Sequence, residues 1–450
     1  MSELVSEVFL AMEMLYQYLW KYRLLNDRLT TVDGRQVEVI YPGRLNSDAG
    51  PDFSGARLRI AGQEWCGNVE IHVKASDWFA HHHDRDAAYG NVILHVVGVN
   101  DMQIPDGSGG VIPQVVATFP DSFVDMYARL AEKISAVACE EWLKRIHPLV
   151  VTDWIESLAV ERMQRKSQRI LDLLTLVNND WQRTCFITLA RSLGFSLNSE
   201  PLEMLARSIP LNVLAHHSDD LMQIEALLFG QAGMLDTSLH IFDEYYQRLC
   251  REYFFLARKY GLRPMRSDVW KYARTRPQNF PTRRIALLAR ALLGGFSLFS
   301  KIIDRSCDAD SAPDLFSWRL DGYWTDHLDF DRPGTKLAAT LSESNVRLLM
   351  INFVAPMIYA YGAYHGDYDM AERGLDIWSE LDAENNKIMR QWQSAGIRCV
   401  SAIDSQALLH LRLEYCDRSR CLQCRFGHTL LRAAANREEK EYLSVAMNMK

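Results

Sequence analysis

Apolar and polar residues alternate along two neighbouring stretches near the N-terminus. Residues 56–62 read ARLRIAG and residues 67–75 read GNVEIHVKA, so apolar side chains recur at every second position. This period is typical of β-strands, whose successive side chains point to opposite faces of a sheet. The same alternation over residues 37–41 predicts another strand, and the β-branched run over residues 91–100 predicts a strand buried on both faces.

Helical spacing surrounds these strands. Apolar residues recur every three or four positions over residues 4–25, and residues 76–91 fit a second helix. From about residue 125 to residue 415 the spacing is helical throughout. We therefore predict an α+β protein in three parts: an αβββαβ domain with a small mixed sheet over residues 1–122, an all-helical domain over residues 123–410, and a cysteine-containing segment over residues 411–450.

Composition places the chain among folded soluble proteins. Of its 450 residues, 48% are hydrophobic and 24% are charged. The first fourteen residues carry three glutamates where a signal peptide would have Lys or Arg. The most apolar stretch, residues 348–364, is interrupted by Asn352 and Pro356, which favours a buried helix over a membrane span. We expect a cytoplasmic protein without a membrane segment.

The hairpin carries polar side chains on one face. Period-two geometry places Glu70, His72 and Lys74 together, and Asp52 enters the preceding strand after Gly-Pro. If Asp52 lies beside Glu70, the two carboxylates repel each other unless they are protonated or share a cation. Mg²⁺ or Mn²⁺ would suit such a pair and would polarise a phosphodiester.

These residues carry a resemblance to the PD-(D/E)XK nuclease superfamily. Pro51-Asp52, then 17 residues, then Glu70-Ile71-His72 stand within a helix–strand–strand–strand–helix–strand order. The resemblance implies that Asp52 and Glu70 bind the metal, with the Ile71 carbonyl completing the ligands, and that phosphodiester bonds of DNA or RNA are hydrolysed. It also implies a lysine two positions after Glu70, where this chain has His72. Lys74 lies one pleat further and is the candidate replacement.

Two other interpretations of the hairpin remain open. Alternating charge is normal on an exposed antiparallel face, and the fold could serve as a non-catalytic nucleic-acid or protein-interaction module. The histidine His95, in the middle of the buried strand, favours a polar pocket. The whole chain also resembles an uncharacterised bacterial family that shares the phrases GPDF, GNVEIHVKASDW, NVILHVV, RPQNFPTRRIALLA and CDRSRCLQC; this resemblance implies no activity.

A histidine cluster, HHHDRD, begins at His81. Histidine and carboxylate are the usual zinc ligands of hydrolases, so a zinc hydrolase built from His72, His83, His95 and Asp52 is a further alternative. Consecutive residues of a helix point about 100° apart, so the three histidines of a helix cannot all face one ion. A polar helix N-terminus lying over the sheet would explain the cluster equally. The candidates for substrate contacts are His83 and Asp86.

Three cysteines near the C-terminus, Cys416, Cys421 and Cys424, form a C-x4-C-x2-C run. A metal centre needs a fourth ligand, for which the candidates are Cys139, Cys399 and His428. Cys₃His suits structural zinc and Cys₄ suits an iron–sulfur cluster. The latter is similar to the iron–sulfur nucleases of recombination and CRISPR adaptation, although there the remote cysteine precedes the nuclease core. Unmetallated thiols are the other interpretation.

A basic stretch covers residues 269–303, which hold seven Lys or Arg and no acidic residue. Its arginines could contact the phosphates of a nucleic acid. They could equally pair with the acidic N-terminal part, since residues 1–121 hold 9 Lys and Arg against 16 Asp and Glu. The candidate nucleic-acid-binding residues are Arg274, Arg276, Arg283 and Arg284.

Overall fold

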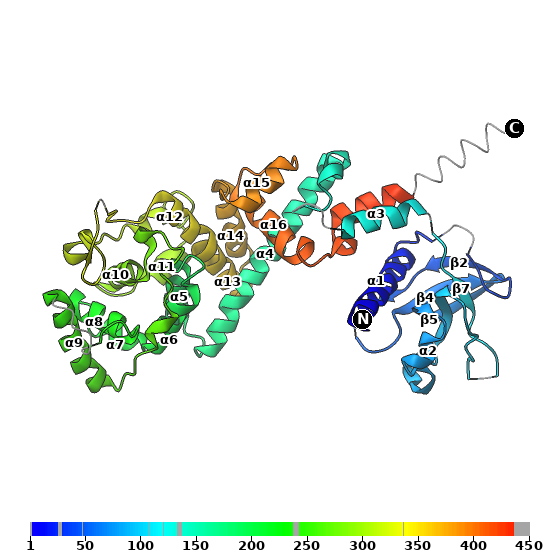
Figure 1. Cartoon of the computed structure of the whole chain (residues 1–450), viewed down its shortest axis with the longest axis horizontal. Coiled ribbons are helices and arrows are strands. Elements are labelled where there is room, and N and C mark those ends of the chain that lie inside the picture. Colours follow the sequence, from blue (N-terminus) through cyan, green and yellow to red (C-terminus); the bar gives the residue numbers. More distant parts are fainter. Residues whose placement is uncertain are drawn as a thin grey trace. The chain divides into compact units, whose positions relative to one another are not determined.

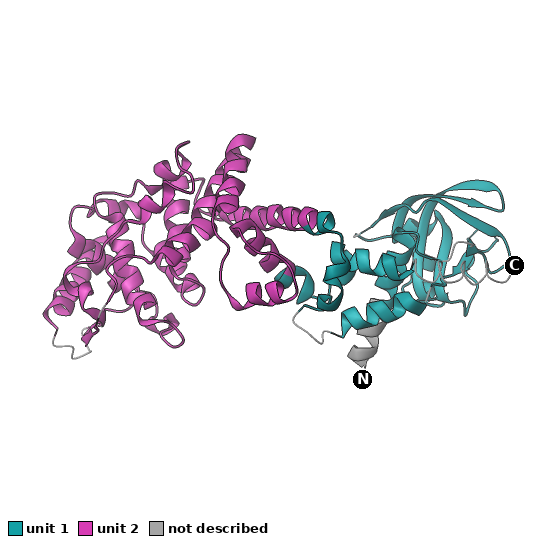
Figure 2. Ribbon diagram, turned by 90° about the horizontal axis from the view of Figure 1, so that it is seen from above, with its two compact units in different colours: residues 1–151, 412–450 teal, residues 152–411 magenta. Residues whose placement is uncertain are grey.

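The protein was analysed as a computed structural model, which divides into two compact units (Figure 2). Unit 1 comprises residues 1–151 and 412–450, and unit 2 comprises residues 152–411. The described residues are 2–25, 29–46, 48–107, 109–119, 121–132, 137–236, 243–335 and 337–435, with backbone alone for residues 2–11. Residues 436–450 of the predicted C-terminal segment thus lie outside the described residues.

Unit 1 is built on a seven-stranded mixed sheet with the order β1-β2-β4-β5-β6-β7, in which β3 pairs with β4. Strand β4 is antiparallel to both of its long neighbours, β2 and β5, whereas β5, β6 and β7 are parallel. The predicted α+β class is confirmed. The predicted order helix, three strands, helix, strand corresponds to α1, β2, β4, β5, α2 and β6, to which the structure adds the short strands β1, β3 and β7. The elements are α1 (Ser2–Lys21), β1 (Leu29–Thr30), β2 (Gln36–Tyr41), β3 (Arg44–Leu45), β4 (Phe53–Ile60), β5 (Gln63–Lys74), α2 (Asp77–Ala80), β6 (Val92–Val99) and β7 (Gln114–Val116).

Strand β5 changes environment along its length. Its first four residues are exposed, whereas Val69 to His72 are all buried. The change occurs where β6 joins the other edge of β5, next to Gly67, at which a Cβ would lie 2.5 Å from a methyl carbon of Ile93. Successive side chains of a strand point to opposite faces, so both faces of β5 are covered here; α1 and α2 both contact the strand. The interpretation of an exposed antiparallel face is therefore wrong for Glu70 and His72, which are 4% and 1% exposed.

The connection from β5 to β6 is less helical than predicted. The helix α2 ends at Ala80, and two short 3₁₀ turns follow, η1 (His83–Arg85) and η2 (Ala87–Tyr89). Between them Asp86 caps η2, accepting a hydrogen bond from the Ala88 backbone N–H at 2.9 Å. Asp and His are weak helix formers that favour caps and turns, which explains the early end of the helix.

The C-terminal segment belongs to unit 1. After the 3₁₀ turn η10 (Cys421–Gln423), a helix over residues 425–435 lies beside α3 (Asp121–Ala131) (Figure 1). The Ser122 hydroxyl donates to the Ala434 carbonyl at 2.9 Å, and the Tyr18 hydroxyl lies 2.7 Å from His428 Nδ1. The units divide after residues 151 and 411, whereas the predicted divisions follow residues 122 and 410. Residues 123–151 stay with the sheet, and the cysteine segment packs on α1 and α3 because its helix has an apolar face to bury.

Unit 2 is a helical body around one hydrophobic core. Three of its helices form a continuous rod over Glu343–His365, which among the described residues is the one helix long and apolar enough to cross a membrane; 61% of its most apolar window is buried inside the protein. The Trp378 indole donates to the Ile351 carbonyl in this rod at 3.0 Å. The helices are α4 (Pro148–Leu176), α5 (Trp181–Leu193), α6 (Ser199–Ser208), α7 (Leu211–Ala215), α8 (Leu221–Gln231), α9 (Glu244–Tyr260), α10 (Pro281–Leu292), α11 (Leu298–Ile303), α12 (Glu343–Leu349), η8 (Met350–Val354), α13 (Ala355–His365), α14 (Tyr368–Glu380), α15 (Lys387–Ser394) and α16 (Ala402–His410), with a small hairpin of β8 (His327–Asp329) and β9 (Arg332–Pro333).

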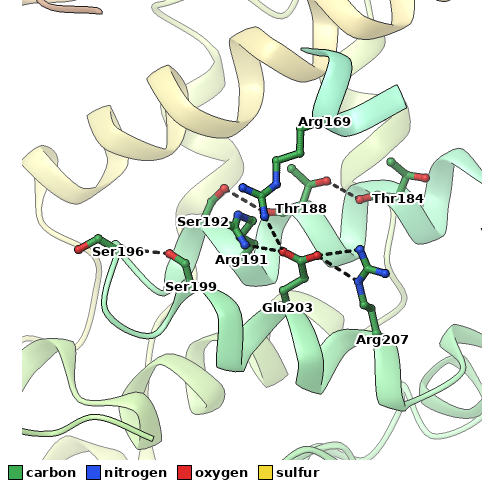
Figure 3. A network of polar contacts seen from close by, with 9 residues as sticks. All are labelled: Arg169, Thr184, Thr188, Arg191, Ser192, Ser196, Ser199, Glu203 and Arg207. Carbon is green, nitrogen blue, oxygen red and sulfur yellow. Dashed lines mark hydrogen bonds and ion pairs between the residues drawn. The ribbon is translucent and has the colours of Figure 1, made fainter. Parts of the chain in front are cut away.

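One polar network ties three helices of unit 2 together (Figure 3). The Glu203 carboxylate of α6 accepts from Arg191 of α5 at 2.5 Å, from Arg207 of α6 at 2.8 Å and from Arg169 of α4 at 3.3 Å. These arginines, led by the hydrogen bonds of Arg191 and Arg207, outweigh burial and lower the pKa of Glu203. The carboxylate is thus neutralised within the protein itself.

Candidate metal centre

The structure brings Asp52 and Glu70 together where β4 begins. The Asp52 backbone N–H donates to Glu70 Oε2 at 2.9 Å, and the Ile71 backbone N–H donates to Asp52 Oδ2 at 3.0 Å. The second Asp52 oxygen accepts from the side chain of Gln17 on α1 at 2.8 Å. Each carboxylate thus accepts a hydrogen bond from the backbone of the segment that carries the other acid. The Gln17 side chain of α1 binds Asp52 as well.

Both carboxyls lie in an environment that disfavours their charge. Burial, and then the charges of Glu70 and Glu13, raise the pKa of Asp52 to about 8. Burial, with a further contribution from Glu13, raises the pKa of Glu70 to about 8 against a hydrogen bond from the Asp52 backbone. The pKa of Glu13 on α1 is itself raised, chiefly by burial. The side chains that act on Asp52 and Glu70 through their charge are therefore acidic, and a bound cation would relieve the repulsion.

Three imidazoles cluster next to Glu70. One nitrogen from each of His72, His81 and His83 lies within 4.8 Å of the others. Glu70 Oε1 lies 3.2 Å from His83 Nε2 and 3.5 Å from His72 Nε2. His72 Nε2 in turn lies 3.2 Å from His81 Nδ1. The three histidines therefore present nitrogens around a common position, with the Glu70 carboxyl beside two of them.

The spacing of these atoms fits a metal ion. A tetrahedral zinc site with ligands at 2.0–2.1 Å holds its donor atoms about 3.4 Å apart. Three separations between neighbouring donor atoms are close to this value: 3.2 Å between Glu70 and His83, 3.2 Å between His72 and His81, and 3.5 Å between Glu70 and His72. A nitrogen-rich set favours Zn²⁺ over Mg²⁺ and Mn²⁺, which prefer oxygen. The residues present therefore suit Zn²⁺ better than the Mg²⁺ or Mn²⁺ predicted from the carboxylate pair.

His95 lies behind this ligand set. Its Nε2 is 2.9 Å from His72 Nδ1, and both rings are buried. Burial lowers the pKa of His72 to about 2 and that of His95 to about 3, so both imidazoles are neutral. If His72 Nε2 binds a metal, its Nδ1–H donates to His95, the outer hydrogen bond that orients most metal-binding histidines. His95 Nδ1 is buried without a hydrogen-bond partner among the described residues.

The backbone at His82 explains how two histidines from one short segment reach the same position. His82 has a φ of 62°, a left-handed conformation, just after α2 ends. The chain turns there, so His81 and His83 both face β5, which the regular helix predicted from sequence would not allow. The His83 ring stacks on Tyr89, with ring centres 3.8 Å apart, and meets the edge of Trp78. These aromatic contacts fix its orientation.

The other residues predicted for this site lie around it. Lys74 is exposed at the end of β5. Its charge acts on Asp101, whose pKa is lowered chiefly by hydrogen bonds from Ser76 and to a lesser degree by Lys74. Asp86 is exposed and serves as the cap of η2, although its charge acts on His83. The sequence interpretation omitted His81 from the ligands and did not include Glu13 and Gln17. Glu13 and Gln17 are four residues apart in a predicted helix and so lie on the same side of it, and this polar pair was the available signal.

Arg283 and Arg284 do not face a phosphate backbone. Both are buried on α10, at 1% and 3% exposed. Arg283 donates to the carbonyls of Trp324 at 2.6 Å, His327 at 2.9 Å and Ala338 at 2.6 Å. The prediction failed because buried arginines that hold loop carbonyls have the same composition as a basic surface. The alternative pairing with the N-terminal part is also wrong for them, since these partners belong to unit 2.

Arg274 and Arg276 are exposed, so for them nucleic-acid contact stays a prediction.

The four predicted ligands Cys139, Cys416, Cys421 and Cys424 all belong to unit 1. Burial, and then the charges of Cys424, Cys416 and Cys421, raise the pKa of the Cys139 thiol. A metal centre at these cysteines stays a prediction. Cys399 lies in unit 2, where it contacts Met389 at 3.5 Å.

The chain belongs to a family of proteins of unknown function, DUF2851, whose model matches residues 13–387. The matched range includes every residue of the candidate metal centre and ends before the three C-terminal cysteines. No curated protein and no solved structure matches the chain.

Proposed function

We propose that unit 1 is a metal-dependent hydrolase of phosphodiesters, a nuclease-type enzyme acting on DNA or RNA. The observation that carries the proposal is the convergence of His72, His81 and His83 at the spacing of metal ligands, with Glu70 beside His72 and His83 and the Asp52 backbone bound to Glu70. A structural ion pair does not require three imidazoles to converge beside a carboxyl, whereas hydrolytic metal sites use histidine and carboxylate donors.

The residues of the site would have separate roles in binding a metal ion and in hydrolysis. A bound Zn²⁺ or Mn²⁺ would polarise a phosphoryl oxygen and lower the pKa of a water molecule. Glu70 and the three histidines would hold the ion, and His95 would keep His72 in the tautomer that leaves Nε2 free. Gln17 and the Ile71 N–H fix the Asp52 carboxyl. A bound cation would favour the charged form of Asp52, which could then accept a proton from the attacking water.

The substrate class rests on the resemblance to PD-(D/E)XK nucleases. The order of α1, β2, β4, β5, α2 and β6 supports it, as does the position of Asp52 immediately before β4, next to Glu70 on the adjoining strand β5. In this proposal His72, which stands in the lysine slot of that pattern, is a metal ligand rather than a replacement for the ammonium. The zinc-hydrolase alternative thereby merges with the nuclease proposal, except that His81 replaces His95 and Glu70 replaces Asp52 in the ligand set.

The consecutive histidines provide the test. His81→Asn and His83→Asn remove one ligand each, whereas His82→Asn alters an exposed neighbour whose left-handed backbone Asn tolerates. We expect the first two variants to bind one metal ion fewer per chain and to lose at least roughly 100-fold in hydrolysis of bis(p-nitrophenyl) phosphate and of single- and double-stranded DNA and RNA with Zn²⁺ or Mn²⁺. His82→Asn should behave as the wild type.

Equal metal content in all three variants would refute the ligand set. Metal loss at His81 and His83 without hydrolysis of any phosphodiester by the wild type would refute the activity. The second outcome would favour the non-catalytic nucleic-acid or protein-interaction module, which nucleic-acid binding by the same protein would then test.

A further inference from the structure

Helix α9 of unit 2 has two faces of different composition. It packs along α8 at an edge of the helical body (Figure 1). Its buried residues recur at helical spacing and are Tyr246, Leu249, Cys250, Tyr253 and Leu256. Its exposed face carries Arg248, Arg251, Phe254, Phe255, Arg258 and Lys259. The side of α9 that meets solvent is therefore basic and aromatic.

The four cations of this face are not neutralised by the fold. In the part of the chain that the structure describes, none of them forms an ion pair. The one acid between residues 245 and 260, Glu252, is half-buried, and its carboxylate accepts from the Gln223 side chain at 2.8 Å. Elsewhere in unit 2 an equally exposed arginine has an acidic partner, as Arg266 has Asp268. In a protein with a net charge of −7, such a local excess of positive charge indicates a surface for a polyanion.

Two phenylalanines lie between these cations. Phe254 and Phe255 are 46% and 66% exposed, although aromatic rings contribute most to stability when they are buried. Exposed rings beside arginines are the arrangement that binds unpaired nucleobases, because a ring stacks on the base while a guanidinium contacts the phosphate. A membrane surface would require a broad apolar face for insertion, and the apolar side of α9 is already buried against the protein.

The exposed face of α9 has the length of a short oligonucleotide. The helical rise of 1.5 Å per residue places Arg248 and Lys259 about 16 Å apart along the axis, which corresponds to about five nucleotides at 3.4 Å each. Four more exposed cations follow the helix in sequence, namely Arg263, Lys271 and the predicted nucleic-acid-binding residues Arg274 and Arg276.

We propose that the exposed face of α9 binds single-stranded nucleic acid, with its four cations on the phosphates and with Phe254 and Phe255 stacked on the bases. The strand is single because stacking on a side chain requires bases that are not paired. The proposal does not depend on hydrolysis in unit 1, since the cations and rings belong to unit 2 and no metal takes part in binding.

Binding of full-length protein to fluorescent oligo(dT) and oligo(U) tests the proposal, by fluorescence anisotropy in chelator over a range of salt concentrations. The double variant Arg251→Ala, Arg258→Ala removes two phosphate contacts. Each contact contributes about 0.7 to the slope of log affinity against log salt, so we expect a slope that is shallower by about 1.4. Phe255→Ala should weaken binding about 5- to 100-fold and leave the slope unchanged.

The matched controls are Arg305→Ala and Tyr368→Ala, which change an exposed arginine and an exposed tyrosine of unit 2 outside this face. Both should bind as the wild type. Because all these side chains are exposed, the variants should unfold at the temperature of the wild type, which thermal unfolding measures in parallel.

A wild type that binds neither oligonucleotide at low salt overturns the proposal, as do affinities and slopes that are the same in all variants. Binding of the wild type to phosphatidylserine vesicles without binding to oligonucleotides would assign the face to an anionic membrane and also overturn it. Unchanged affinity in Phe255→Ala would refute the stacking and with it the preference for a single strand. Failure of hydrolysis in unit 1 would leave each of these expectations unchanged.

Discussion

Glu70 in unit 1 and Glu203 in unit 2 are both largely buried glutamates, yet they meet opposite surroundings. Glu203 is held by three arginines (Figure 3), which lower its pKa. Glu70 meets a second carboxyl and neutral imidazoles, and burial raises its pKa to about 8. The charge of Glu203 is neutralised by arginines of the protein, whereas the charged form of Glu70 would be stabilised by a bound cation.

This difference separates a structural network from a candidate site more sharply than burial alone. A protein normally pairs the charges that it buries, because an unpaired buried charge costs several kcal/mol. Glu203 follows this rule. The cluster of Glu13, Asp52 and Glu70 departs from it, and such departures are expected where function outweighs stability.

Exchanging each carboxyl for an amide should therefore have different consequences: Glu70→Gln should reduce hydrolysis, and Glu203→Gln should reduce stability. The effect in unit 1 should be the larger. Glu70→Gln keeps an acceptor for the Asp52 N–H but removes a metal ligand. We expect phosphodiester hydrolysis to fall at least roughly 100-fold, beyond the effect of outer-shell residues, while the metal-free variant is more stable than the wild type near neutral pH, because Gln needs no proton in order to be buried. Hydrolysis assays and thermal unfolding in chelator measure both. Glu64→Gln, which changes an exposed glutamate of the same strand paired with Arg59, is the control; full activity of Glu70→Gln would refute the ligand role.

The outer histidine should matter less than the ligands. His95→Gln keeps a group able to accept from His72 Nδ1 but holds it less rigidly. We expect metal affinity to fall about 10–100-fold, with maximal hydrolysis recovered at high metal concentration. Metal titrations followed by activity test this, and activity that excess metal cannot restore would instead make His95 a direct participant.

Much of unit 1 could be predicted from the sequence because local periodicity carried the information. Alternation in β4 and β5 and the β-branched run of β6 gave the element order, and the Pro-Asp and Glu spacing placed Asp52 beside Glu70. The sequence did not show that both faces of β5 are covered. That depends on α1 packing from some 50 residues away, which period-two spacing does not report.

Two further features were invisible for physical reasons. A single left-handed residue, His82, decides that His81 joins the ligands, and histidine has only a weak preference for that conformation. The burial of Arg283 depends on carbonyls between residues 324 and 338 that a basic stretch does not predict. Tertiary contacts of single residues set these features, whereas patterns over many residues set the fold.

The pH dependence of stability should distinguish the two glutamates next. In metal-free protein, folded Glu70 with a pKa of about 8 retains a proton that the unfolded chain releases above about pH 4.5, so stability declines as pH rises toward 8. The lowered pKa values of His72 and His95 act only below about pH 6.5. From pH 6.5 to 8 we therefore expect Glu70 to reduce the free energy of unfolding by up to about 1.4 kcal/mol per pH unit.

Thermal unfolding in chelator across this range measures the effect. Glu70→Gln should show a shallower decline than the wild type, and saturating Zn²⁺ or Mn²⁺ should remove the Glu70 contribution because the bound ion keeps the carboxylate charged. Identical slopes for the wild type and Glu70→Gln in chelator would mean that Glu70 is ionised without a cation.

Glu203→Gln should have the smallest effect, and it should lower the free energy of unfolding without changing hydrolysis. Arg169 and Arg207 are 59% and 41% exposed, so solvent screens much of their attraction, and we expect a loss of only about 1 kcal/mol, a decrease in Tm of about 2–4 °C. Because the pKa of Glu203 is lowered, its contribution is present at neutral pH and disappears as pH falls through that lowered value. Thermal unfolding at pH 7 in low and high salt measures it, with the exposed Glu156→Gln on α4 as control. Hydrolysis should be unaffected, because this carboxylate has its cations built into the fold; an activity loss as large as that of Glu70→Gln would show that the contrast between the two glutamates does not separate structure from function.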